Sequence, residues 1–259
     1  MLRSALVFNH WLTHLVLSPL LLIQGVYVRV KTPRLPEAKG ERQGFVSNDK
    51  PRLSFKVIGD SAAAGVGASH QQEALSGQIL KFLNQRYSVN WQLEAWSGCT
   101  TSAMISHLDN LPSEKQNIVV TSLGVNDLIT GVSIDTWLSQ QSQLLQLIRE
   151  KYSPEMIVLS ALPEMSRFPA LPQPLRKILG GRAELFNQRM RAFVTTQNDC
   201  FHLRLDIADT PSLMASDGFH PGPQAYELWG EAVVSAIEMN RAVVIEKNSN
   251  SKQLLVYSN

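Results

Sequence analysis

The chain has 259 residues, of which 44% are hydrophobic and 18% charged, so it can bury the core of one α/β domain with a short appendage and is not disordered over most of its length. Its 24 basic and 22 acidic residues give a net charge of +2, too weak a basic field to favour nucleic-acid binding. Cys99 and Cys200 are far apart and outside any Cys-x-x-Cys pattern, which excludes a disulfide scaffold and a cysteine-based zinc site.

The chain begins with an uncharged stretch from Ser4 to Val28, which is long enough to cross a bilayer as a helix. Polar residues on one face and Pro19 interrupt it, so a signal-peptide core, a membrane anchor and a buried helix all fit its apolar centre. No cleavage site follows, and basic residues outnumber acidic ones at 29–42. We therefore expect a membrane-associated protein with an uncleaved anchor at 1–30 and its main domain on the cytoplasmic side, or in the periplasm or outside the cell if cleavage occurs.

The rest of the chain is predicted to contain a linker, one domain and a tail. Pro, Gly and charged residues dominate 31–52, which favours a linker or an arm on the surface. Apolar runs that alternate with helical patterns over 53–241 predict a three-layer α/β/α sandwich around a five-stranded parallel sheet. The expected strands are Ser54–Ile58, Trp91–Ala95, Ile118–Leu123, Met156–Leu162 and Leu203–Ile207. Residues 242–259 show no sustained period and are expected to be a loosely attached tail.

Residues that can do chemistry follow the first three of these strands. In a parallel sheet of this kind, ligands bind beyond the carboxyl ends of the strands. Ser61 comes after the first strand, Gly98 after the second and Asn126 after the third. A glycine backbone N–H and an asparagine amide are donors that can stabilise an oxyanion beside a nucleophilic serine. Each position also fits an ordinary turn, with Asp127 as an N-cap.

An acid and a histidine follow the last expected strand, in the run from Asp217 to Pro221. Pro221 disfavours a helical conformation at His220, so this histidine should lie on an extended loop before the final helix. Asp217 can then accept a hydrogen bond from Nδ1 and leave Nε2 free to take a proton from a serine. An Asp-Gly turn beside a surface histidine fits the same residues.

These blocks together are similar to the SGNH hydrolases, also called GDSL esterases or lipases. The resemblance rests on Gly59-Asp60-Ser61, on Gly98, on Gly-x-Asn-Asp at 124–127 and on Asp-x-x-His at 217–220, and it covers 53–240. It implies a flavodoxin-like α/β/α fold and serine-dependent ester hydrolysis without a metal or cofactor.

The resemblance also implies roles for individual residues. Ser61 would be the nucleophile, His220 the general base and Asp217 its orienting acid. The oxyanion hole would comprise the backbone amides of Ser61 and Gly98 and the side chain of Asn126. Asp60, which stands beside the serine, is not expected to be the acid.

The substrate is predicted from a proline-rich loop at 163–176 that follows the fourth expected strand. Phe168, Leu171 and Leu175 are candidates to bind an acyl chain, and Arg167 or Arg176 an anionic head group, although a rigid connector fits them equally. Together with an anchor, these residues favour an acyl or lipid-like ester over a carbohydrate acetyl ester or an acyl thioester. The alternatives of other kinds are a membrane-tethered binding module without turnover, and Cys99 as the nucleophile.

Overall fold

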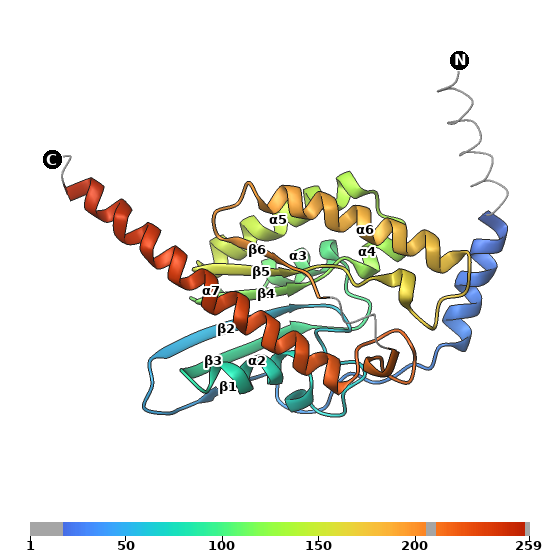
Figure 1. Cartoon of the computed structure of the whole chain (residues 1–259), viewed down its shortest axis with the longest axis horizontal. Helices are drawn as coiled ribbons and strands as arrows, with labels where there is room; N and C mark the ends of the chain where they lie inside the picture. Colours follow the sequence, from blue (N-terminus) through green and yellow to red (C-terminus); the bar gives the residue numbers. More distant parts are fainter. Residues whose placement is uncertain (1–17, 206–210, 257–259) are drawn as a thin grey trace, which may run out of the picture.

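The short apolar runs form a six-stranded sheet in the computed structural model, which describes residues 18–205 and 211–256 (Figure 1). The strand order is β1-β3-β2-β4-β5-β6, with β1 antiparallel to β3 and the other neighbours parallel. The strands are β1 (Gln43–Val46), β2 (Arg52–Gly59), β3 (Ser88–Ala95), β4 (Ile118–Ser122), β5 (Met156–Ser160) and β6 (Cys200–Leu203). The last strand begins and ends earlier than expected, and residues 206 and 207 of the expected strand lie outside the described residues.

Helices cover both faces of this sheet, which confirms the predicted three-layer α/β/α class. The helices are α2 (Leu75–Leu83), α3 (Thr101–Asp109), α4 (Val125–Ile129), α5 (Ile134–Tyr152), α6 (Leu175–Val194) and α7 (Pro223–Val256). Helices α2 and α7 lie on one side of the sheet and α3, α5 and α6 on the other (Figure 1). Apolar residues of each group form a core with the sheet. Helix α7 continues to Val256, through most of the segment that we expected to be a tail.

Strand β1 lies inside the segment at 31–52, where the sequence predicted a linker or arm. It pairs with the edge of β3, with Gly44 opposite Trp91 and Phe45 opposite Asn90. Its four residues are exposed or half-buried because β1 is the edge strand, so its apolar pattern is too weak to predict a strand. The sheet is therefore mixed with six strands, where we expected a parallel sheet with five.

The described part of the expected membrane anchor forms a helix at 18–31 that is attached to the domain. The Gln24 side chain donates to the Gln173 carbonyl oxygen at 2.6 Å and accepts from the Leu175 N–H at 3.1 Å, and Val28 packs against the core. Among the residues that the structure describes, no helix combines the length and the apolar character that a membrane span needs. This finding overturns the membrane-associated localisation that we predicted; residues 1–17 of the expected anchor lie outside the described residues.

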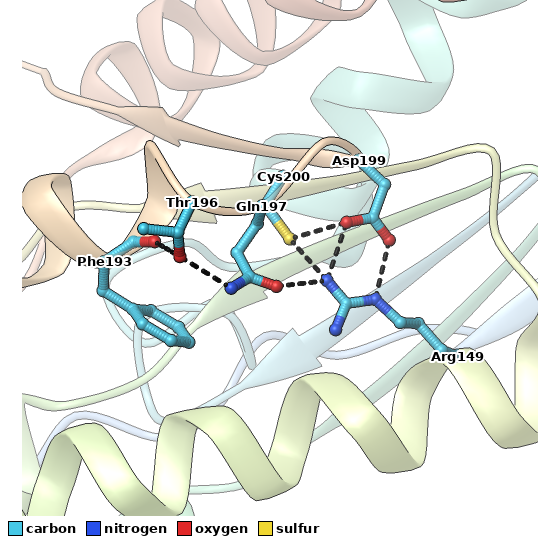
Figure 2. Close-up of polar contacts among 6 residues, drawn as sticks. All are labelled: Arg149, Phe193, Thr196, Gln197, Asp199 and Cys200. Carbon is cyan, nitrogen blue, oxygen red and sulfur yellow. Dashed lines mark hydrogen bonds and ion pairs between the residues drawn. The ribbon is translucent and has the colours of Figure 1, made fainter.

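A polar cluster ties helix α5 to the beginning of β6, away from the carboxyl ends of the strands (Figure 2). Two nitrogens of Arg149 donate to the two carboxylate oxygens of Asp199 at 2.8 and 2.7 Å, and one of them also donates to Gln197 at 2.9 Å. These bonds lower the pKa of Asp199. Burial raises the pKa of the neighbouring Cys200 to about 12, so this cysteine is a thiol that packs between the helix and the strand.

Candidate active site

Ser61 lies in the turn after β2, at the carboxyl edge of the sheet. The Asp60 N–H donates to the carbonyl oxygen of Ser122 on β4 at 3.1 Å, and the Val66 N–H donates to the Ser61 carbonyl oxygen at 3.0 Å. The position before the turn must be glycine, because a β-carbon on Gly59 would overlap the Ser122 carbonyl oxygen. The turn therefore holds the Ser61 hydroxyl in a defined place beyond the strand.

His220 connects Ser61 to Asp217. Its Nε2 lies 2.9 Å from the Ser61 Oγ, and its Nδ1 lies 2.6 Å from the Asp217 Oδ2. The other oxygen of Asp217 accepts the backbone N–H groups of Phe219 and His220. Gly218 has a φ of 63°, which allows the tight turn that folds the acid back toward the imidazole. The structure thus brings the predicted serine, histidine and acid into one chain of hydrogen bonds.

Asp217 is a buried carboxylate whose side chain is 1% exposed. Burial acts to raise its pKa, but hydrogen bonds from the His220 ring and from the backbone N–H groups of His220 and Phe219 outweigh burial, and the pKa is lowered. The ionised acid holds a proton on Nδ1 of His220. Nε2 can then accept a proton from the Ser61 hydroxyl.

Gly98 and Asn126, the other predicted oxyanion donors, are joined through Cys99. Asn126 Nδ2 donates to the Cys99 carbonyl oxygen at 2.9 Å, which uses one amide hydrogen and leaves the second for a ligand. Gly98 has a φ of 82°, and a β-carbon there would meet no atom within 4 Å, so its backbone borders open space. Within the described residues, the N–H groups of Ser61 and Gly98 donate to no other residue.

Two carboxylates to which the sequence assigned no part in catalysis hold the loop that carries Gly98. Glu37, from the segment before β1, accepts the Ser97 N–H at 2.7 Å. Asp127 accepts both the N–H and the hydroxyl of Thr101 at 3.0 Å. The sequence suggested Asp127 as an N-cap, but the helix whose first turn it binds is α3 and not its own helix α4.

Cys99, the alternative nucleophile, has no exposed surface. Burial, and then the negative charges of Asp60 and Asp127, raise the pKa of its thiol to about 12. The reactive thiolate is therefore not populated at neutral pH, which favours Ser61. In the part of the chain that the structure describes, no three His, Cys, Asp or Glu side chains are grouped so that they could hold a metal ion.

A cavity of about 100 Å³ opens beside Ser61 and His220. It lies at the carboxyl ends of β4 and β5 and reaches Trp229 on α7. Phe168, which was predicted to contact the substrate, lines the cavity and packs edge-on against Phe219, with ring centroids 5.1 Å apart. The geometry gives the serine a largely apolar neighbouring space.

The other residues predicted to contact the substrate lie in the loop itself or in the core. Leu171 is 2% exposed and belongs to the core beneath α5 and α6, and Leu175 packs against the same core. Arg176 Nε donates to the Leu171 carbonyl oxygen at 2.5 Å, so it braces the loop. Arg167 forms an ion pair with Glu164 at 3.1 Å.

Asp60 is a buried carboxyl group outside the Ser61–His220–Asp217 chain. It is 4% exposed, and its Oδ1 accepts the Ala62 N–H at 3.1 Å. Burial raises its pKa to about 6; the Asp127 charge adds to this rise, and the Ala62 N–H and His220 oppose it. Because the pKa is above the ordinary value of 3.8, the folded state keeps a proton between about pH 4 and pH 6 that the unfolded state has lost.

Asp60→Asn is therefore expected to raise the free energy of unfolding at pH 8 by about 1–3 kcal/mol, since the folded wild-type protein must bury a charge at this pH. The gain should shrink as the pH falls through about 6 and be largely lost near pH 4, where folded wild-type Asp60 is protonated and the unfolded carboxyl is close to its ordinary pKa of 3.8. Urea unfolding at pH 4 and pH 8 measures the difference, with the exposed Asp49→Asn as a control. An effect of Asp60→Asn that is equal at the two pH values would contradict the expectation.

Both the sequence and the fold are similar to known proteins. The family model of the GDSL-like Lipase/Acylhydrolase family matches residues 57–228. No curated protein is similar enough in sequence to match the chain.

Three of the solved structures with this fold are an esterase, a lipase and a carbohydrate esterase. The psychrotrophic esterase EstA from Pseudoalteromonas sp. is 19% identical, with a TM-score of 0.58 over 72% of this chain and 97% of that chain. A lipase from a goat rumen metagenome is 20% identical, with a TM-score of 0.56 over 71% and 97% of the two chains. The family 3 carbohydrate esterase of Clostridium thermocellum is 17% identical, with a TM-score of 0.55 over 74% and 99%. At these identities the likeness shows a common fold.

Proposed function

The chain belongs to the GDSL-like lipase/acylhydrolase family and is a hydrolase that acts on ester bonds, and we propose that it cleaves carboxylic esters with Ser61 as its nucleophile. The observation that carries this proposal is the chain of hydrogen bonds from the Ser61 Oγ through His220 to Asp217, at 2.9 and 2.6 Å. A serine becomes an effective nucleophile when an adjacent base can take its proton, and His220 Nε2 is within reach to do so.

In the first half of the reaction, the Ser61 Oγ bonds to the ester carbonyl carbon while its proton passes to His220 Nε2. Asp217 stabilises the imidazolium that forms, because its carboxylate is ionised and accepts the Nδ1 hydrogen. The carbonyl oxygen becomes an oxyanion. The backbone N–H groups of Ser61 and Gly98 and the second amide hydrogen of Asn126 are the donors that we assign to this oxygen.

In the second half, the tetrahedral intermediate collapses and the bond to the alcohol oxygen breaks. His220 Nε2 gives its proton to that oxygen, so the alcohol leaves neutral and an acyl group remains on Ser61. A water molecule then attacks the acyl carbon and passes its proton to His220. The carboxylic acid departs as Ser61 recovers its proton, and no cofactor enters this sequence.

The possible esters differ in the sizes of the acyl and alcohol groups. The sequence favoured an acyl or lipid-like ester, with a carbohydrate acetyl ester and an acyl thioester as alternatives. A lipid-like ester carries a long acyl chain, the acyl group of a carbohydrate acetyl ester is short, and an acyl thioester can carry either. The size of the cavity beside Ser61 therefore helps to decide among these ester classes.

Fluorophosphonate labelling tests the nucleophile. An activated serine displaces fluoride from phosphorus and keeps the phosphonyl group on its Oγ, so peptide mass analysis should find the label on Ser61. Ser61→Ala should remove the label, and Ser102→Ala, at an exposed serine on α3, should retain it. Labelling of Cys99 or of another serine, or no labelling of the folded protein, would reject Ser61 as the nucleophile.

A further inference from the structure

The cavity beside Ser61 exists because side chains become small at the ends of the central strands. Val57, Val120 and Val158 point to the face that α2 and α7 cover and belong to that core. Side chains alternate along a strand, so the residues two positions later point to the same face. These residues are Gly59, Ser122 and Ser160, which lie on adjacent strands. The place of a side chain at Gly59 is filled by Ala63 and Ser122, whereas Ser122 and Ser160 line the cavity. Replacing valines by these two serines leaves space between the end of the sheet and α7.

Trp229 borders this space from the side of α7. Its indole Nε1 donates to the Ser160 Oγ at 3.2 Å, and its ring stacks on Tyr226 with centroids 6.2 Å apart. Tyr226 is itself fixed by a hydrogen bond from its hydroxyl to the Val66 carbonyl oxygen at 2.7 Å. The indole is 6% exposed, so its position is set by packing and hydrogen bonding on several sides. Ser160 and Trp229 therefore form a fixed wall of the cavity.

The acyl group suits this cavity better than the alcohol group does. The alcohol must leave before water can attack the acyl-serine, so it needs a path to solvent. The acyl group stays bonded to Ser61 through both halves of the reaction and can occupy a space between the sheet, the His220 loop and α7.

The cavity volume limits the length of that group. At about 100 Å³ it is well below the roughly 300–1,000 Å³ that is usual for a pocket that encloses a drug-sized ligand, so it suits a short acyl group. On the basis of the proposed esterase function, we infer that the cavity is the acyl site, that Ser160 and Trp229 limit its depth, and that the substrate carries a short acyl group. This assigns a short-chain ester in place of the long-chain, lipid-like ester that the sequence favoured.

Two series of esters separate the acyl site from the alcohol site. In the first series, p-nitrophenyl esters from acetate to octanoate vary the acyl group and keep the alcohol constant. In the second, alkyl acetates from ethyl to hexyl vary the alcohol, and acid release is followed at constant pH. The wild-type protein should hydrolyse acetate and butyrate faster than hexanoate and octanoate in the first series, and its rate should depend much less on chain length in the second.

Ser160→Leu fills the cavity, and Trp229→Phe enlarges it. Ser160→Leu should lower kcat/KM for butyrate relative to kcat/KM for acetate by about 10- to 200-fold, which is the usual effect when a pocket is too small by about one methylene group. Enlarging should raise the ratio for hexanoate to butyrate by about 10-fold. Ser142→Leu, which makes the same change at an exposed position on α5, should alter neither ratio. If Ser160→Leu fails to fold, as judged by thermal denaturation, Ser160→Val fills less of the same space and should shift the ratio in the same direction.

The outcomes distinguish this inference from the function on which it rests. Wild-type hydrolysis that depends on Ser61, with ratios unchanged in folded Ser160→Val and Trp229→Phe, would overturn the acyl site and leave the esterase function standing. A shift confined to the alcohol series would overturn it as well, because the cavity would then hold the alcohol. Absence of any hydrolysis that depends on Ser61 would overturn the proposed function and the acyl site together.

Discussion

Ser61→Ala is expected to lower kcat for p-nitrophenyl acetate by about 10⁶-fold, the size of effect seen when the nucleophile of a serine hydrolase is removed. The alanine variant has no oxygen that can bond to the acyl carbon, and His220 then has no hydroxyl to deprotonate. The oxyanion donors are untouched, so a small rate above that of the reaction in water should persist.

The fold should tolerate this change, because the Ser61 side chain makes its hydrogen bond within the described residues to His220 Nε2. Initial rates at saturating substrate give kcat, and thermal denaturation checks that the variant is folded. Ser102→Ala serves as the matched control and should retain both activity and stability. Activity of Ser61→Ala within 10-fold of wild type would exclude Ser61 as the nucleophile.

Asp217→Asn is expected to lower kcat by about 10⁴-fold without preventing folding. The asparagine oxygen can still accept the backbone N–H groups of Phe219 and His220, so the turn should persist. Its NH₂ group, however, would donate to Nδ1 of His220. The proton of the neutral ring would then lie on Nε2, and Nε2 could no longer accept a proton from Ser61.

Acid unfolding provides a second measurement on Asp217. Its pKa is lowered in the folded state, so its ionised form stabilises the fold above pH 4 and this contribution is lost as the pH falls through the folded pKa. Asp217→Asn should therefore weaken the fall in stability between about pH 4 and pH 2. In the kinetic measurement, a kcat of Asp217→Asn within 10-fold of wild type would show that Asp217 does not determine which nitrogen of His220 carries the proton.

The arrangement of the candidate site was predictable where local sequence carries the information. Short apolar runs that alternate with helical patterns predict a parallel sheet, and residues that directly follow parallel strands meet at one edge of that sheet. That reasoning marked Ser61, Asp217 and His220 as candidates but also allowed ordinary turns, and the resemblance to the SGNH hydrolases implied their roles. The structure brings the three side chains within hydrogen-bond distance. The Pro after His220 and the Gly after Asp217 indicated the turn, because both residues restrict or permit backbone conformations locally.

Other features depended on neighbours that no local pattern reveals. The residues of β1 are exposed or half-buried, and they form a strand because they pair with β3. Their composition therefore suggested a linker. The segment with Gln24 looked like part of an anchor, but its side chain bonds to a loop almost 150 residues away in sequence. Asp127 lies in the first turn of one helix and binds the first turn of another.

The sequence by itself determined the α/β class, the parallel central strands and the set of residues at their carboxyl ends, because side-chain periodicity and turn chemistry act over a few residues. Only the tertiary structure decided the sixth strand, the docking of the segment at 18–31 and the cavity beside Ser61. The cavity needs Ser122 and Ser160 on adjacent strands with Trp229 near them on α7. Its shape depends on register and on packing between layers, and these are settled when the chain folds.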